Sequence, residues 1–207
     1  MSKLLFVSSS ILGENSKSRA LGVHFIEAWK RQHPGTRIVE RDLVAETLPH
    51  VTGAVLGAAL TPAEKRSPEQ AETAALADRL IEEVEAADVI LLAVPMYNFS
   101  VPSTFKAWID HVVRAGRTFR YGAEGPVGLL QNKKVFVVAS RGGVYSSGPG
   151  KSMDFHEPYL RGVLGFIGLK DVTFIYAEGL NISPETATGA LDGARATIAE
   201  LLVQVAA

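Results

Sequence analysis

Three short segments of the chain gather side chains that could bind a ligand, and the first of them is rich in hydroxyl groups. Ser10, Ser16 and Ser18 stand in this segment, with Lys17 between the last two serines. A helix is expected to begin here, and the first N–H groups of a helix have no acceptor within it, so that they attract anions. Ser16 could serve only as the helix cap. Three hydroxyls at one helix start favour a phosphate site, and we call this segment the phosphate loop.

The second segment lies between Pro95 and Pro102 and carries aromatic and sulfur-containing side chains. It follows a strongly apolar run, and a buried strand normally leads into polar turn residues instead. Aromatic rings suit the face of a flat ring system, and an amide can bond to the edge of a heterocycle. A rigid turn that packs on itself is the alternative, but the pattern favours a ring-binding role. We call this segment the ring loop; its candidate residues are Met96, Tyr97, Asn98 and Phe99.

The third segment, which we call the glycine loop, consists of Ser140, Arg141, Gly142 and Gly143. Paired glycines allow the backbone to approach a ligand closely and to present bare N–H groups. Two turn glycines are common in proteins, so this motif carries little weight alone. Other kinds of site have less support. The five histidines show no metal-ligand spacing, and the glycine spacing before Lys151 does not fit a phosphate-binding P-loop.

Composition narrows the class of protein further. The 207-residue chain contains no cysteine, which excludes disulfides, thiolate metal centres and cysteine nucleophiles. Its 21 basic and 22 acidic side chains give a formal charge of −1, which favours neither nucleic-acid binding nor a strongly acidic electron carrier. No apolar run approaches the roughly 20 residues of a membrane span. We therefore expect a cytoplasmic protein without a bound metal.

The spacing of apolar residues predicts strands that alternate with helices. Short apolar runs indicate strands over 3–9, 36–43, 88–94, 134–140 and 171–176. Helical periodicity and capping patterns indicate helices over 18–32, 68–86, 103–115, 158–168 and 184–205. The remaining segments are expected to form an irregular stretch over 48–62, a small hairpin over 118–128 and a long loop over 141–157.

This alternation predicts a single domain over residues 1–207 that has a parallel sheet with helices on both faces. Right-handed crossovers and five strands favour the flavodoxin-like, doubly wound α/β fold with strand order 2-1-3-4-5. Ligands bind to such sheets in a crevice beyond the carboxyl ends of the strands. The phosphate, ring and glycine loops follow the first, third and fourth strands, so this fold would bring them together.

Taken together, these loops resemble those of the FMN-dependent NADH-azoreductase family, a branch of the flavodoxin-like NAD(P)H:quinone oxidoreductases. The likeness covers nearly the whole chain. It is most specific where Pro95-Met96-Tyr97-Asn98-Phe99 is combined with Ser140-Arg141-Gly142-Gly143. Further similar motifs are Ser9-Ser10-Ile11-Leu12, Arg114-Ala115-Gly116-x-Thr118-Phe119-Arg120-Tyr121, Leu164-Gly165-Phe166-Ile167-Gly168 and Ala177-Glu178-Gly179.

The resemblance implies one FMN in each subunit of a homodimer, with NAD(P)H as reductant and quinones or azo compounds as acceptors. It matches the phosphate loop to the FMN phosphate, the ring loop to the isoalloxazine ring, and the glycine loop to the other edge of that ring. A flavin carries the redox chemistry itself, so no side chain is required as a catalyst. NAD(P)H and the acceptor would then use one site in turn, in a two-electron ping-pong cycle.

Several side chains could assist such a cycle. N–H groups of the glycine loop, or the guanidinium of Arg141, could stabilise negative charge on the reduced ring. Phe119, Tyr121 and Phe166 are candidates for stacking on a planar substrate, some of them from the partner subunit; their alternative role is packing. A preference for NADPH would need a cation near its 2′-phosphate, for which Lys65 or Arg66 could serve.

The expectation of a dimer also has support from one helix. Residues 103–115 carry apolar side chains over a wide arc, which we expect a second subunit to cover. Two other functions remain compatible with the fold, because this architecture hosts many activities. They are a non-enzymatic flavodoxin-like electron carrier or redox scaffold, and a phosphate- or nucleotide-binding module without flavin. The ring loop favours the reductase.

Overall fold

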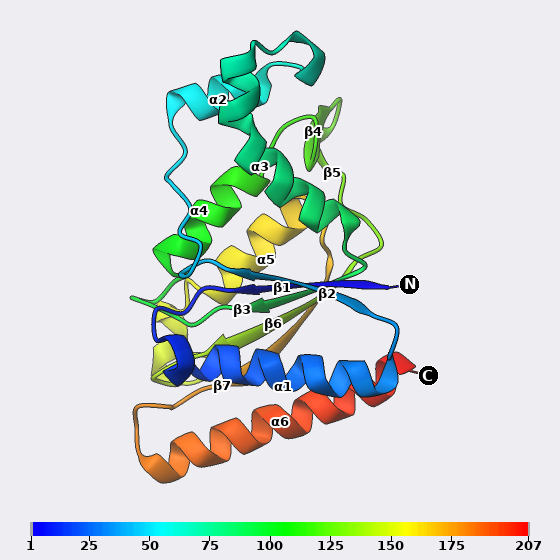
Figure 1. The fold of residues 1–207 in the computed structure, drawn as a ribbon. Helices are drawn as coiled ribbons and strands as arrows, with labels where there is room; N and C mark the ends of the chain where they lie inside the picture. The colour runs from blue at the N-terminus through cyan, green and yellow to red at the C-terminus, as the bar shows by residue number, and fades with distance from the viewer. Residues whose placement is uncertain (1, 207) are drawn as a thin grey trace.

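A five-stranded parallel sheet forms the centre of the computed structural model, which describes residues 2–206 (Figure 1). Its strands are β1 (Lys3–Ser8), β2 (Arg37–Asp42), β3 (Val89–Ala93), β6 (Lys134–Ser140) and β7 (Asp171–Ala177). They lie in the order β2-β1-β3-β6-β7, and every neighbouring pair is parallel. This is the predicted order 2-1-3-4-5, so the flavodoxin-like fold class is confirmed.

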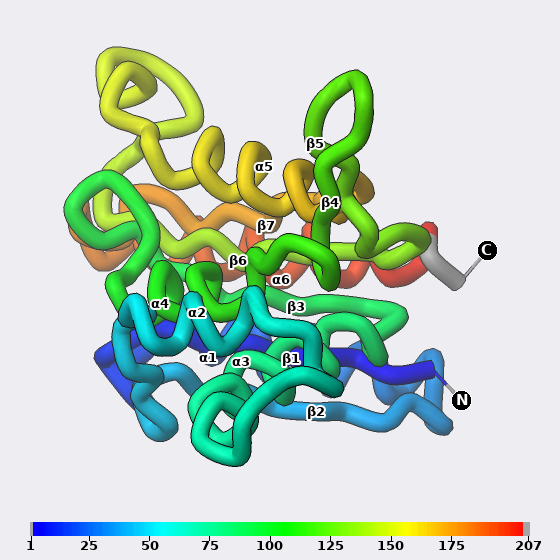
Figure 2. Tube along the Cα trace, turned by 90° about the horizontal axis from the view of Figure 1, so that it is seen from above, coloured from blue at the N-terminus to red at the C-terminus, as the bar shows by residue number. Residues whose placement is uncertain are grey.

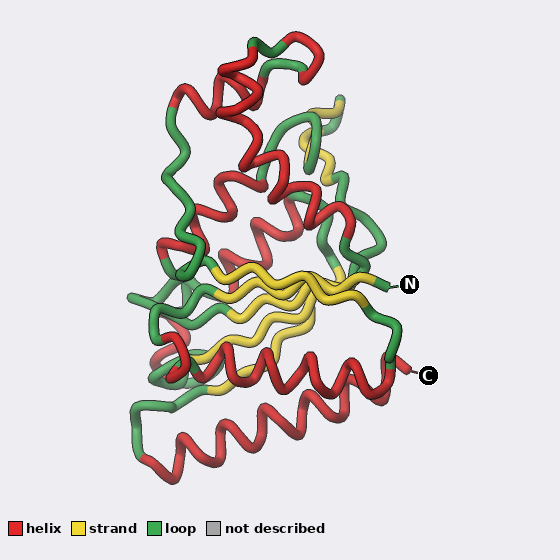
Figure 3. Tube along the Cα trace, in the orientation of Figure 1, coloured by secondary structure: helices red, strands yellow, loops and turns green. Residues whose placement is uncertain are grey.

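Helices cover both faces of this sheet, as the layers in Figure 3 show. One face carries α1 (Lys17–Gln32) and α6 (Pro184–Ala206), which pack against each other; the other carries α3 (Pro68–Ala86), α4 (Ser103–Val112) and α5 (Glu157–Phe166). Each layer encloses its own apolar core, around Phe25 on the first face and around Trp108 on the second. Because the central strands are covered on both faces, they consist almost entirely of buried apolar residues.

Local sequence signals explain where two of these helices begin and how closely one approaches the sheet. Ser67 Oγ accepts from Gln70 N at 3.2 Å and Gln70 Oε1 accepts from Ser67 N at 3.0 Å, a capping box that starts α3 as predicted. Ser183 Oγ likewise accepts from Thr186 N at 3.1 Å before α6. Gly22 allows helix α1 to lie close to β1, since a Cβ at this position would come within 2.6 Å of the Phe6 ring.

The segment between β2 and α3 differs from the prediction. The prediction of an irregular stretch over 48–62 is wrong, because Gly53–Leu60 form the helix α2. Thr52 caps it by accepting from Val55 N at 3.3 Å, and Ala58 is buried where α2 packs on α3. The segment is rich in small apolar residues and shows no helical spacing of polar and apolar positions. Its packing on α3 therefore stabilises a helix that the local pattern does not predict.

The segment after α4 forms the predicted hairpin, with β4 (Phe119–Gly122) antiparallel to β5 (Gly125–Gly128). Helix α4 ends at Val112, earlier than the predicted 115, because the backbone of Arg114 turns and bonds to Thr118. The hairpin projects at the end of the molecule where the strands begin (Figure 2). Among residues 2–206, no helix has the length and apolarity that a bilayer crossing requires.

Candidate functional site

The phosphate, ring and glycine loops meet at the carboxyl ends of β1, β3 and β6, on the left in Figure 1. The hydroxyl of Tyr97 lies 3.2 Å from Ser10 Oγ and accepts from Ile11 N at 3.2 Å, which joins the ring loop to the phosphate loop. Met96 N donates to Ser140 O at 2.9 Å, which joins the ring loop to the glycine loop. The structure therefore brings together the three segments that the sequence analysis selected.

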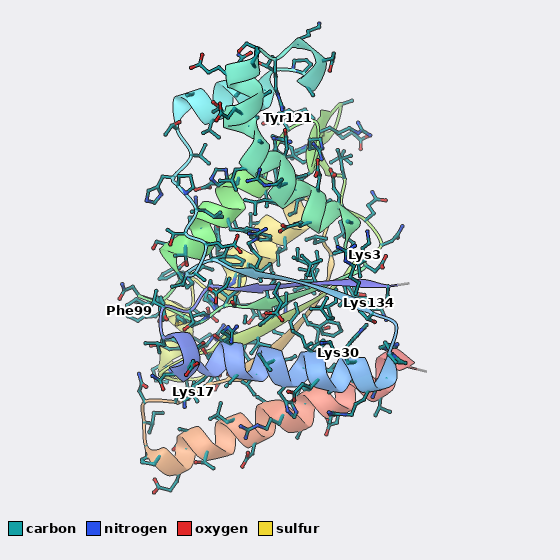
Figure 4. All side chains as sticks on the ribbon, in the orientation of Figure 1. Lys3, Lys17, Lys30, Phe99, Tyr121 and Lys134 are labelled. Carbon is teal, nitrogen blue, oxygen red and sulfur yellow. The ribbon has the colours of Figure 1, made fainter. Side chains whose placement is uncertain are left out.

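Buried hydroxyls and free helix N–H groups characterise the phosphate loop. The exposed fractions of Ser10, Ser16 and Ser18 are only 6%, 2% and 0%. Ser16 caps α1 by accepting from Arg19 N at 3.1 Å, and its Oγ lies 3.2 Å from that of Ser18. This cap leaves the N–H groups of Lys17 and Ser18 without an acceptor in the helix, at the positive end of its dipole. Lys17 is exposed at the same helix end (Figure 4). The arrangement suits an anion.

The ring loop contains a strained tight turn. Tyr97 and Ser100 exchange two backbone hydrogen bonds, with N···O distances of 2.9 and 3.1 Å. Between them Asn98 and Phe99 have φ angles of 47° and 70°, as in a type I′ turn, where glycine is usual in the second central position. A phenylalanine in this backbone region is strained, and such strain is concentrated at functional sites. The turn presents Asn98 and Phe99 to the outside (Figure 4).

In the glycine loop the backbone carbonyl groups have hydrogen-bond partners, whereas the N–H groups of its two glycines do not among the described residues. The carbonyls of residues 141–143 accept from the segment after β7 at N···O distances of 2.9–3.1 Å; the donors are Gly179 N, Leu180 N and Asn181 N. Within residues 2–206 the N–H groups of Gly142, Gly143 and Val144 have no acceptor. Gly142 permits this close pairing, since a Cβ there would lie 2.6 Å from Asn181 Nδ2. Three successive donors are thus available to a ligand.

The side chain of Arg141 is turned away from these donors. It is fully buried, and its Nη1 lies 2.9 Å from Glu178 Oε1 and 3.1 Å from Asp154 Oδ2. Its guanidinium also stacks over the Tyr176 ring at 5.0 Å. Of the two groups considered for stabilising charge on a ring, the N–H groups of the glycine loop are therefore the accessible ones.

Glu178 is a residue to which the sequence analysis assigned no role. Burial by itself would raise the pKa of its carboxyl group, but hydrogen bonds from Ser146, from Tyr145 N and from Arg141 outweigh burial and lower that pKa. The carboxyl group therefore stays ionised, and its hydrogen bonds with Arg141, Tyr145 N and Ser146 N hold the glycine loop in place. Its only sequence signal was its place in Ala177-Glu178-Gly179, directly after a predicted strand.

The candidate stacking residues lie elsewhere. Phe119 packs against Tyr121 and Phe166, with ring centroids 5.5 and 4.5 Å apart. Phe119 is buried, whereas 76% of Tyr121 and 36% of Phe166 are exposed. This cluster sits on the β4–β5 hairpin and the end of α5, and Figure 4 shows Tyr121 far from Phe99, which lies at the carboxyl ends of the strands. Within one chain these rings do not line the crevice.

Two further expectations from the sequence are corrected. The apolar arc of α4 does not need a second subunit, because Phe105, Trp108 and Ile109 are buried within the chain itself. Arg66 is not a spare cation, because its Nη1 lies 2.7 Å from Asp78 Oδ2 and its Nε donates to Thr61 O at 3.0 Å. Both features depend on side-chain contacts that form on folding, which the spacing of residue types does not reveal.

The doubly wound sheet, with hydroxyl and N–H donors gathered at the carboxyl ends of its strands, defines a flavodoxin-like protein. A family model described as the flavodoxin-like fold matches residues 2–202. The FMN-dependent NADH:quinone oxidoreductase of Herminiimonas arsenicoxydans is 52% identical over 98% of this chain and 99% of that protein. FMN-dependent NADH:quinone oxidoreductase 3 of Pseudomonas aeruginosa is 48% identical over 98% of this chain and 93% of that protein.

A solved structure gives the same result in three dimensions. The crystal structure of the azoreductase from Bacillus anthracis str. Sterne matches with a TM-score of 0.89 and 31% identity, over 98% of this chain and 99% of that one. The chain therefore belongs to the flavodoxin-like family that includes these FMN-dependent quinone reductases and azoreductases. This membership confirms the resemblance that the loop motifs indicated.

Proposed function

We propose that the chain is an FMN-dependent NADH:quinone oxidoreductase that also reduces aromatic azo compounds. The observation that carries this conclusion is the junction of three loops with different donor chemistry. Buried hydroxyls and a helix N-terminus suit a phosphate, and bare N–H groups lie at the neighbouring loop beside exposed aromatic and amide side chains. The relatives named above have the same activity in their names.

The donor groups of the described residues fit both the phosphate end and the ring end of FMN. A phosphate would be bound by the serines and Lys17 at the start of α1, and the ring would lie between the ring loop and the glycine loop. We propose one FMN in each subunit. The residues that would hold it are Ser10, Ser16, Lys17, Ser18, Met96, Tyr97, Asn98, Phe99, Ser140, Arg141, Gly142 and Gly143, of which Arg141 contributes through its backbone.

Bound FMN supplies two-electron redox chemistry, with hydride taken from NADH and electrons delivered to the acceptor. The protein contributes binding and electrostatics. The N–H groups of residues 142–144 would stabilise negative charge on the reduced ring, and they would need little reorganisation because their loop is already held. The side chains of Asn98 and Phe99 are exposed on the ring loop. We propose that donor and acceptor occupy the space beside the ring in turn.

We further propose that the enzyme is a homodimer with its active site at the subunit interface. The support is the exposed aromatic cluster of Tyr121 and Phe166, with the exposed apolar side chains of Val127 and Leu129 beside it. Tyr121 lies far from Phe99 of the same chain (Figure 4), and we propose that this surface completes the site of a second subunit. Residues 1–207 then act as one domain in each subunit, and the cytoplasm remains their predicted location.

The test of the proposed function is an absorption spectrum followed through one catalytic cycle. The purified chain should be yellow, lose its visible absorbance with one equivalent of anaerobic NADH, and regain it when a quinone is added. Initial rates at several quinone concentrations should give parallel double-reciprocal lines. A protein that stays colourless after incubation with FMN would overturn the proposal. Slow oxidation of NADH with normal FMN binding would instead favour the electron carrier.

The dimer has its own test. Light scattering gives the mass in solution, and a Tyr121→Ala variant with lowered quinone turnover but unchanged FMN content would support a ring shared across the interface. A monomeric mass at assay concentration would overturn the dimer without affecting FMN binding. The turnover assay also compares NADH with NADPH as the reductant. Lys65 is the candidate cation for the 2′-phosphate of NADPH, because it is exposed whereas Arg66 pairs with Asp78.

A further inference from the structure

One carboxylate gathers the donors on the underside of the glycine loop. Glu178 Oε1 accepts from Arg141 Nη1 at 2.9 Å, from Tyr145 N at 3.0 Å and from Ser146 N at 3.1 Å. Glu178 Oε2 accepts from the hydroxyl of Ser146. Four donors from one short segment therefore converge on a single side chain, which stands directly after β7.

These bonds divide the loop into two functional halves. The N–H groups of Tyr145 and Ser146 are taken by Glu178, whereas those of residues 142–144 have no acceptor among residues 2–206. The carbonyl groups of residues 141–143 are held by the backbone after Glu178. Both ends of the bare donor segment are thus tied to the four residues 178–181, and this leaves residues 142–144 little freedom to turn.

A buried ion pair makes this anchor possible. The Glu178 side chain is 12% exposed and the Arg141 side chain is not exposed at all, so their opposite charges compensate each other out of water. Arg141 Nη1 also lies 3.1 Å from Asp154 Oδ2, while Asp154 Oδ1 accepts from His156 N and Glu157 N at the start of α5. Two carboxylates around one guanidinium leave a net negative charge beneath the loop.

We propose that Glu178 is a positioning residue for the FMN reaction, which holds the N–H groups of residues 142–144 as fixed donors to the cofactor. This inference rests on the proposed function. It assigns two separable effects to the side chain. Its length determines the geometry of the donors, and its charge opposes the gain of negative charge on the ring. A carboxylate that served only to stabilise the fold would have neither effect.

Two substitutions separate length from charge. Glu178→Asp keeps the charge but withdraws the acceptor by one methylene, so the dissociation constant for FMN should rise about tenfold. Glu178→Gln keeps the reach of Oε1, and the bond with Ser146 can reverse, so FMN affinity should stay close to that of the parent. Loss of the charge should raise the midpoint potential of bound FMN, by about 30 mV for each tenfold change in relative affinity for the reduced form.

The matched control is Glu157→Asp, which shortens a partly buried carboxylate at the start of α5 in the same way. Glu157 accepts from the Tyr176 hydroxyl and pairs with Arg161, but it takes no donor from the glycine loop. This variant should lose thermal stability without a change in FMN affinity or potential. Affinity is measured by quenching of FMN fluorescence with apoprotein, the potential by reductive titration, and folding by circular dichroism.

The outcomes distinguish the inference from the proposed function. Normal FMN affinity in Glu178→Asp, or an equal loss of affinity in Glu157→Asp, would overturn the positioning role. An unchanged potential in Glu178→Gln would overturn the assigned effect of charge. Failure of the unaltered protein to bind FMN would instead overturn the proposed function itself.

Discussion

The hydroxyl of Tyr97 lies 3.2 Å from Ser10 Oγ and also accepts a hydrogen bond from Ile11 N. One side chain of the ring loop is thereby bonded to both the backbone and a hydroxyl of the phosphate loop. These loops are 87 residues apart in the chain, so their relative position depends on this contact and on the pairing of β1 with β3. The protein itself thus sets the spacing between its phosphate and ring sites.

Removal of this hydroxyl should weaken FMN binding. Tyr97→Phe leaves Ile11 N without its partner, whereas Ser10 Oγ still accepts from Leu12 N, so a net loss of about 1 kcal/mol and roughly fivefold in affinity is expected. Fluorescence quenching on titration of apoprotein with FMN measures the change. The control is Tyr145→Phe, because that hydroxyl has no hydrogen-bond partner within residues 2–206. Equal affinities for both variants would contradict the role of Tyr97.

The buried serines of the phosphate loop should contribute more. Hydrogen bonds to a charged group are worth roughly 1.5–3 kcal/mol each, so a combined Ser16→Ala and Ser18→Ala change should weaken FMN binding about a hundredfold or more. Part of any stability loss comes from the missing helix cap. Ser67→Ala removes an equivalent cap from α3 and should cost about 1 kcal/mol of stability with no change in FMN affinity. If the double variant keeps the affinity of the parent, the phosphate lies elsewhere.

Strain at Phe99 should trade folding stability for ligand binding. Phe99→Gly relieves a φ of 70°, which costs of the order of 1 kcal/mol or more, but it removes a ring at the crevice. We expect the apoprotein to keep its free energy of unfolding within about 1 kcal/mol while quinone turnover and FMN affinity fall. Asn132→Gly is the matched control, since Asn132 has a φ of 60° away from the site. A Phe99→Gly variant with unimpaired turnover would show that the strain serves no function.

His156 should make stability depend on pH. The side chain is fully buried and neither ring nitrogen has a hydrogen-bond partner in the described structure. Burial, followed by the charge of Arg141, lowers its pKa from 6.5 to about 4. Between these values the unfolded chain binds a proton that the folded protein does not, so stability falls as the pH decreases from 6.5 towards 4, by up to about 3 kcal/mol.

Urea denaturation at pH 7, 6 and 5 measures this dependence. His156→Leu should flatten the decline over that range, because the buried titrating group is gone. His50→Leu, at an exposed position, should keep the slope of the parent. A parent protein and a His156→Leu variant with the same slope would assign the pH dependence to other groups.

Much of the fold could be predicted because its signals are local. The apolar run Val89–Ala93 indicates a strand that is buried on both faces, and Ser67 with Gln70 indicates the start of α3. The handedness of crossovers then limits the order of the strands. The positions of the three loops follow directly, since each comes after a central strand.

Other features depend on which distant segments come into contact. Helix α2 forms through its packing on α3, and the apolar face of α4 is covered by the same chain rather than by a partner. Tyr121 follows α4 closely in sequence, yet it lies well outside the sheet and far from Phe99 (Figure 4). Residue types and their spacing along the chain do not tell which of these segments come into contact.

The sequence by itself determined the layered α/β architecture, the strand order and the three segments that form the crevice, because periodicity, capping and chain handedness are properties of neighbouring residues. Only the tertiary structure decided that Arg141 turns inward to Glu178, 37 residues further along the chain, and that the glycine loop is left to present its backbone N–H groups. A side chain's direction depends on the partner that compensates its charge after burial, and that partner is brought into contact by folding.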